Sequence, residues 1–100
     1  MSYAEAAHQE VLRELREIDR GFRSPTLAME TMAYHYTLLA IVKGEETTSK
    51  DVHDAWSMAT FPFDPTHRSL VPFEELTEEV QAYDDVYRDA IVRVAARLKA

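Results

Sequence analysis

Apolar residues recur every three or four positions along most of this chain, the spacing that places side chains on one face of an α-helix. Residues 3–22 carry one such stripe, a shorter stripe begins near Ser49, and a third extends from Leu76 to Leu98. A threonine followed by two glutamates opens the third segment, which is typical of a helix start. Three amphipathic helices are therefore predicted.

Residues 25–43 show a different pattern, with apolar side chains around nearly the whole circumference of the expected helix. A helix of this kind is buried on several sides. In so small a chain it lies either at the centre of a bundle or against a second copy, and we expect a homodimer. Because Met adapts to partner surfaces and Tyr is favoured at interfaces, the candidate interface residues are Met29, Met32, Tyr34 and Tyr36.

Residues 60–71 break the helical pattern. Pro62 and Pro65 each remove a backbone donor and push the preceding residue towards an extended conformation. We expect an irregular loop that could include a short strand, followed by a single helical turn at 72–76. The last helix then begins after Thr77.

The bulk properties limit the classes of fold and partner. A length of 100 residues fits one domain, so we predict a mainly α, four-helix small domain over 1–100 that begins with a helical hairpin at 1–48. The formal charge of -7 falls mostly in the second half and disfavours nucleic acid as a partner. No apolar run is long enough for a membrane span, and the N-terminus lacks the pattern of a signal peptide. Together with the absence of cysteine, this leads us to expect a cytoplasmic protein without a membrane partner.

The chain lacks the motifs of common catalytic and cofactor sites. Gly21 and Gly44 are its two glycines, so it has no glycine-rich phosphate loop, no nucleophile elbow and no kinase-like set of motifs. Its four histidines do not have the spacing of metal ligands. We therefore predict a non-enzyme with no cofactor and no metal.

Two pairs of residues could nevertheless bind a small molecule. His53 and Trp56 are three residues apart on one predicted helix, so an imidazole and an indole could flank a flat heterocycle. The structural alternative is that Trp56 packs in the core and His53 caps its edge. His67 and Arg68 lie at a loop boundary and could receive a phosphate or carboxylate. Alternatively, His67 pins the loop through a hydrogen bond to a backbone carbonyl.

Tyr83 and Asp84 form a third candidate pair near the start of the last helix. A phenol and a carboxylate could hold a ribose hydroxyl or help to bind a divalent cation. Asp85 points about 100 degrees away from Asp84 on a helix, so the two acids cannot readily chelate one ion unaided. The alternative is that Asp84 forms a hydrogen bond into the preceding loop while Asp85 is solvated.

Three short segments follow one another in a recognisable order: His53-Asp-Ala-Trp56, then His67-Arg-Ser-Leu-Val-Pro-Phe-Glu-Glu-Leu76, then Val80-Gln-Ala-Tyr83-Asp84. Together they resemble the ryanodine-receptor repeat, or RyR domain. The resemblance covers about residues 51–92 and makes 49–100 an RyR-like unit. Arg68 stands where that family usually has Pro, and Asp85 where it usually has Arg. The resemblance implies a stand-alone prokaryotic or phage domain that binds a nucleotide-derived small molecule.

Two functions are consistent with these observations. The first is a non-catalytic RyR-like binding module for a small nucleotide-like ligand, with the indole stacking on the ligand and an arginine meeting its anion. Its candidate ligand-binding residues are His53, Trp56, His67, Arg68, Tyr83 and Asp84. The alternative is a structural or protein-interaction adaptor, such as a phage or bacterial regulatory protein, that acts through the helix at 25–43.

Overall fold

Four α-helices account for most of the chain, and the computed structural model describes all residues from 1 to 100. The helices are α1 at Tyr3–Ile18, α2 at Leu27–Val42, α3 at Ser49–Thr60 and α4 at Glu78–Lys99. Three short 3-10 turns stand between them, η1 at Arg20–Arg23, η2 at Gly44–Glu46 and η3 at Phe73–Glu75. The predicted mainly α, four-helix fold is confirmed, and the loop contains no strand.

Side-chain caps determine where the helices begin. Thr26, Thr48 and Thr77 precede α2, α3 and α4, and each hydroxyl accepts a hydrogen bond from the backbone N–H three residues later. Asp51 completes a capping box in α3, because its carboxylate accepts the Thr48 N–H at 3.0 Å. The predicted cap at Thr77 is confirmed, and the second helix begins after Thr26, at Leu27, two residues beyond the predicted start at 25.

Local turns end the first two helices, and the end of α1 differs from the prediction. α1 stops before Asp19, which has an extended backbone and accepts the Gly21 N–H on its carboxylate at 2.8 Å. The helix is therefore shorter than the predicted 3–22, although η1 still carries Phe22 into the core, where it is 1% exposed. After α2, Gly44 has a φ of +61°, in the left-handed region that favours glycine.

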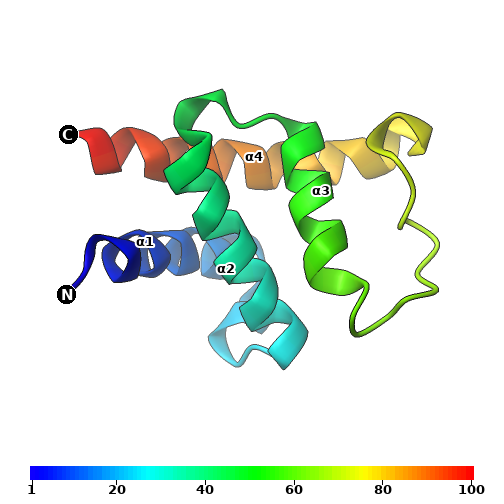
Figure 1. Ribbon diagram of the computed structural model, residues 1–100, viewed down its shortest axis with the longest axis horizontal. Coiled ribbons are helices and arrows are strands. Elements are labelled where there is room, and N and C mark those ends of the chain that lie inside the picture. The colour runs from blue at the N-terminus through cyan, green and yellow to red at the C-terminus, as the bar shows by residue number, and fades with distance from the viewer.

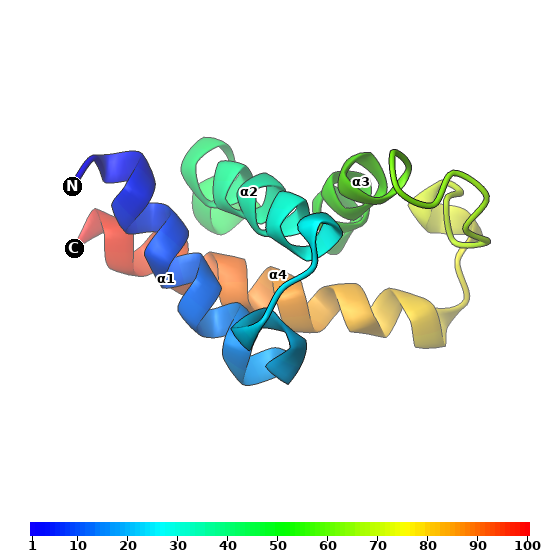
Figure 2. The ribbon, with the colours of Figure 1, turned by 90° about the horizontal axis from the view of Figure 1, so that it is seen from below.

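The helices lie in two layers. α4 runs along the length of the molecule, and α1 lies beside its C-terminal part and runs in the opposite direction (Figure 1). α2 and α3 lie next to each other and cross over α4, as the view from below shows (Figure 2). The two termini lie together at one end, and the loop between α3 and α4 lies at the other. None of the helices has both the length and the apolar character needed to cross a membrane.

One core includes side chains from all four helices. Each large apolar side chain buried there contributes about 1.5–3 kcal/mol to the free energy of folding, and these contributions hold the two layers together. The buried residues of α4 lie between positions 90 and 95. Tyr83 and Leu98, which the apolar spacing placed on the buried face, lie outside this range and are 65% and 40% exposed. The core residues are Val11, Leu15, Phe22, Ala33, Tyr36, Ala40, Val52, Ile91 and Val94.

A charged clamp joins α1 to α4 near the termini. The Glu14 carboxylate accepts hydrogen bonds from Arg93 Nη2 at 2.8 Å and from Arg97 Nη2 at 3.0 Å. Burial alone would raise the pKa of Glu14, but the two guanidinium groups outweigh it and hold that pKa below its usual value. The negative charge of Glu14 is thus compensated by two cationic side chains.

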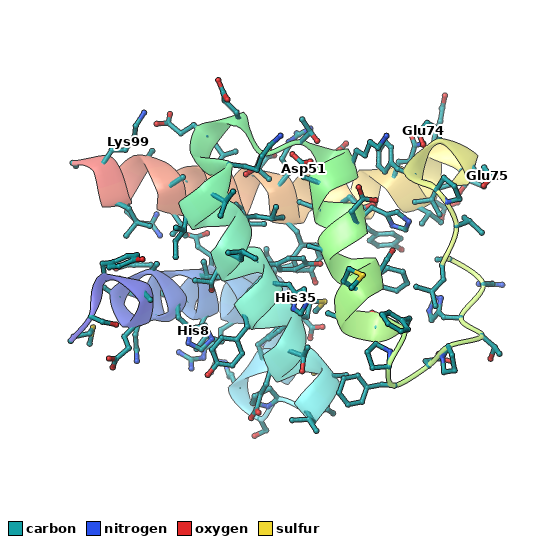
Figure 3. All side chains as sticks on the ribbon, viewed as in Figure 1. His8, His35, Asp51, Glu74, Glu75 and Lys99 are labelled. Carbon is teal, nitrogen blue, oxygen red and sulfur yellow. The ribbon has the colours of Figure 1, made fainter.

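The loop at 61–72 is a succession of turns. The backbone N–H groups of Asp64, His67 and Leu70 donate to carbonyls three or four residues earlier, at 2.9, 3.2 and 3.1 Å. The following turn η3 is tied to α4 by Gln81, whose side-chain amide donates to the Phe73 carbonyl at 3.0 Å. Figure 3 shows the acids of η3, Glu74 and Glu75, at the outer end of the molecule, where both are exposed.

Candidate functional site

A pocket of about 200 Å³ lies where α2, α3, α4 and the loop meet. Most of its wall is aromatic or aliphatic, and it carries one carboxylate and no lysine or arginine. We call it the Trp56 pocket. Its lining residues are Met32, Tyr36, His53, Trp56, Ser69, Val80, Tyr83, Asp84 and Tyr87.

His53 forms the inner side of the pocket and is held in one orientation. It is 3% exposed, and its Nε2 lies 2.6 Å from the Val71 carbonyl oxygen. Because a carbonyl can only accept, Nε2 carries the proton and donates it to the loop. The ring also stacks against Trp56, with centroids 5.6 Å apart and planes 22° apart. His53 therefore anchors the loop and positions the indole.

Asp84 is the pocket's acid and has no hydrogen-bond donor within the protein. Its side chain is 14% exposed, and His53 Nδ1 lies 3.9 Å from its Oδ2, beyond hydrogen-bond range. Burial raises the pKa of Asp84 to about 6, despite the opposing effect of His53 and with a small contribution from Asp85. The group is thus mostly ionised at neutral pH in a place that does not compensate its charge.

Two phenols complete the aromatic wall beside this acid. The rings of Tyr36 and Tyr87 are 5.6 Å apart and tilted by 45°. Burial raises the pKa of Tyr36 well above its usual value, with further contributions from the Tyr87 and Asp84 charges, and burial also raises the pKa of Tyr87. Both hydroxyls stay protonated at neutral pH and remain available as donors.

Trp56 is half-buried and contacts the loop on its other side. The His67 ring meets it edge-on, with centroids 5.0 Å apart and planes 80° apart. His67 Nδ1 accepts the Ser69 N–H at 3.0 Å, so this histidine does pin the loop, although it bonds an amide instead of the expected carbonyl. Arg68, next to it, is exposed and does not line the pocket.

The structure thus brings together four of the six candidate ligand-binding residues. His53, Trp56, Tyr83 and Asp84 line one pocket, His67 supports it from behind, and Arg68 lies outside it. The expected hydrogen bond from Asp84 into the loop is absent, and His53 makes that contact in its place. Sequence reasoning missed Tyr87, although it follows Tyr83 by one helical turn. The further pocket residues that it missed are Met32, Tyr36, Ser69 and Val80.

Asp85 was expected in solvent and instead joins α4 to α3. Its carboxylate accepts hydrogen bonds from the Ser49 hydroxyl and, at 3.4 Å, from Arg88. Arg88 also donates to Ser49 at 3.1 Å. Ser49, Asp85 and Arg88 do not line the pocket, so the two adjacent acids have separate roles.

The candidate interface residues on α2 do not share one surface. Tyr36 is 2% exposed and belongs to the core, and Met29 and Met32 are half-buried against that core. A surface role for Tyr36 is therefore ruled out in the folded chain. Tyr34 is 63% exposed, and its ring stacks on His8 of α1 with centroids 4.3 Å apart.

No group of three His, Cys, Asp or Glu side chains is placed so that it could hold a metal ion. Figure 3 shows His8 on α1 and His35 on α2, whereas His53 belongs to α3. His35 Nδ1 is 2.8 Å from the Thr31 carbonyl of its own helix and donates to it. His35 thus bonds within its own helix, whereas His8 stacks on Tyr34 of α2 and its Nε2 is buried without a hydrogen-bond partner.

Comparison with curated proteins and with solved structures gives no match. The resemblance to the ryanodine-receptor repeat is wrong, because the family model that fits this chain is a different one and includes α1 and α2, which that motif left out. The misleading residues have local roles, since His53 bonds Val71 and stacks near Phe73, contacts that close the loop on α3. With residues 3–96 matched, the chain belongs to the family described as a domain of unknown function (DUF7701).

Proposed function

We propose that this domain is a non-catalytic module that binds a small organic molecule in the Trp56 pocket. The observation that supports it most is Asp84, an acid held without a donor inside a mainly aromatic pocket. Such a group costs stability unless something outside the protein satisfies it, and shifted pKa values of this kind gather at functional sites. The pocket also combines apolar walls with few polar groups, which is typical of ligand sites.

A binding role is favoured over catalysis by the restraint on the pocket's histidine. The Nε2–H of His53 is already committed to the Val71 carbonyl at 2.6 Å, and its ring is stacked on Trp56. A general base must have a free nitrogen within reach of the reacting proton. Nδ1 faces Asp84 and is deep in the wall, where it serves to place the ring.

A nucleotide is a poor match to this pocket. Arg68, the residue expected to meet the phosphate, lies outside it, and no other lysine or arginine lines it. A phosphate placed there would face the Asp84 carboxylate without a cation to neutralise it. We therefore restrict the proposal to small ligands without an anionic group.

The single tryptophan of the chain is a built-in reporter for this proposal, because Trp56 lines the pocket. Titration with indole, benzyl alcohol, adenosine and AMP, followed by Trp56 fluorescence and by thermal unfolding, tests it. We expect at least one neutral aromatic compound to give a saturable change and a higher midpoint of unfolding, and AMP to give none.

A matched pair of variants locates the binding. Tyr83→Ala removes an exposed ring from the pocket rim, whereas Tyr34→Ala removes a similarly exposed ring from α2. Binding should weaken in Tyr83→Ala and stay unchanged in Tyr34→Ala. Equal binding by both variants, or no response at millimolar concentration to any small organic compound without an anionic group, would remove the basis of the proposal.

A second candidate function, an interface between two copies or with another protein, is favoured by the outer face of α2. Apolar side chains recur there at helical spacing and are 40–69% exposed, more than isolated surface residues require. They are Leu27, Tyr34, Leu38, Ile41 and Val42. Light scattering at low concentration tests the homodimer that we expect, with Leu38→Glu predicted to give a monomer; a wild-type monomer would contradict it.

The cytoplasm remains the proposed location. The support for it is the absence of cysteine, which fits a reducing compartment. Measurement of the native protein's distribution between cell fractions would decide it.

A further inference from the structure

The walls of the Trp56 pocket combine several aromatic rings with one negative charge. Trp56, Tyr36, Tyr83 and Tyr87 supply aromatic rings, whose faces carry partial negative charge. Asp84 adds a full negative charge, and no cationic side chain lines the same space. The full charge of the carboxylate and the ring faces outweigh the neutral hydroxyls of Tyr36 and Tyr87 and favour a positive ligand.

We propose that the ligand of this pocket is a small organic monocation of the ammonium type, held between the aromatic rings and the Asp84 carboxylate. This inference rests on the function proposed above, and it names the chemical class that the pocket selects. Aromatic rings attract a cation through their quadrupoles, and the attraction is stronger where water is partly excluded. The ammonium group would supply the counter-charge that Asp84 lacks within the protein.

The geometry around Asp84 explains why a cation, and not a neutral donor, is the best match. The carboxylate is 14% exposed and faces His53 Nδ1 at 3.9 Å, a separation too long for a hydrogen bond. The His53 Nε2–H is donated to Val71, so Nδ1 is the ring nitrogen that faces the acid, and no hydrogen bond joins the two. The carboxylate therefore attracts a donor group that bears positive charge.

The size of the pocket limits the cation. Its volume of about 200 Å³ is smaller than that of pockets that hold drug-sized molecules, which begin at about 300 Å³. A methylated or primary ammonium with a short carbon chain fits this limit, whereas a folded peptide segment does not. The overall charge of -7 would also raise the local concentration of cations near the protein.

Three probes of nearly the same shape and different charge test the inference. They are choline as the cation, 3,3-dimethylbutan-1-ol as the neutral molecule and 3,3-dimethylbutanoate as the anion. Binding is measured on the full chain at neutral pH and low salt, by calorimetry and by Trp56 fluorescence. We expect choline to bind at least about tenfold more tightly than the neutral probe, and the anion to bind least.

Two isosteric variants assign that preference to one carboxylate. Asp84→Asn should remove the cation preference, so that choline and the neutral probe bind within about twofold of each other. Asp89→Asn removes the same charge from an exposed position on the same helix, outside the pocket, and should leave the preference intact. If Asp84→Asn does not fold, the three-probe comparison on the native chain still decides.

The possible failures separate the two proposals. If the neutral probe binds as tightly as choline, or if Asp84→Asn keeps the preference, the cation inference is overturned and the pocket remains a binding site. If the three probes fail while neutral aromatic compounds bind, the same conclusion holds. If neither set of compounds changes Trp56 fluorescence or thermal stability, both proposals are overturned together.

Discussion

Glu14 and Asp84 are two acids of similar burial with opposite environments. Their side chains are 17% and 14% exposed, yet the pKa of Glu14 is held low while that of Asp84 rises to about 6. The difference is the presence of partners: Glu14 has two arginines and Asp84 has none. One end of the molecule uses its charges to join helices, and the other keeps a charge that the fold does not satisfy. Such an uncompensated group is the expected mark of a site selected for binding at some cost in stability.

The largest effect is expected from removing the histidine that shapes the pocket end. His53→Ala deletes the hydrogen bond to Val71 and leaves a gap between Trp56 and Phe73, so we expect a loss of about 2–3 kcal/mol in the free energy of unfolding. Urea unfolding followed by circular dichroism measures it. His35→Ala, which removes only a contact within α2, should cost clearly less; an equal loss would contradict the anchoring role.

A change at Asp84 is expected to stabilise the protein instead. Replacement with Asn removes a poorly compensated charge, and after allowance for its partial exposure we expect the free energy of unfolding at neutral pH to rise by about 1–2 kcal/mol. Asp89→Asn is the matched control, since that acid is 56% exposed, and it should change stability by less than about 0.5 kcal/mol. A destabilised Asp84→Asn variant would mean that the acid has a structural partner.

The same contrast should appear in the dependence of stability on pH. The folded pKa of Asp84 is raised from 3.8 to about 6, so the native state binds more protons in this window and stability falls as pH rises through it. The groups that act on it are His53 and Asp85. The free energy of unfolding is measured against pH for the native chain and for Asp84→Asn, and the second curve is subtracted from the first. The difference should fall by about 1–2 kcal/mol as pH rises and level off above about pH 6. A flat difference curve would contradict the uncompensated charge.

The smallest effect is expected at the clamp. Glu14→Gln weakens the bonds to Arg93 and Arg97, and because the arginines are about half exposed we expect a loss of only about 0.5–1 kcal/mol. The folded pKa of Glu14 is lowered, so this contribution is present above its unfolded value of 4.5 and disappears as pH falls below it. Thermal unfolding at neutral pH and in acid measures it, and a loss that persists in acid would argue for packing instead of charge.

The helices were predictable because their signals are local. Apolar spacing identified all four, and threonine caps and Gly44 act within a few residues, so Ser49 and Thr77 were correctly placed. The exceptions have a physical cause as well. Asp19 ends α1 by bonding Gly21, while Phe22 continues the apolar stripe through a 3-10 turn that sequence spacing cannot distinguish from a helix.

The pocket was predictable only in part, because its wall combines near and distant residues. His53 with Trp56, and Tyr83 with Asp84, lie together because they are neighbours on single helices. Tyr36 comes from α2, and its place depends on how the layers cross, which no local pattern records. The direction of Arg68 depends in turn on a loop without regular structure. The motif that suggested a ryanodine-receptor repeat includes His53 and Phe73, which close the loop on α3, while the family model that matches the chain is a different one.

The turns at 61–72 also have a kinetic consequence. Their backbone hydrogen bonds are mostly internal, and the stretch is fastened to α3 mainly by His53 at Val71, so it can detach as a unit while the helices stay intact. Its amides should then exchange with deuterium through an opening that requires less free energy than global unfolding. Since Ser69 of this stretch lines the Trp56 pocket, we expect the residence time of a bound molecule to depend on how often the stretch detaches from α3.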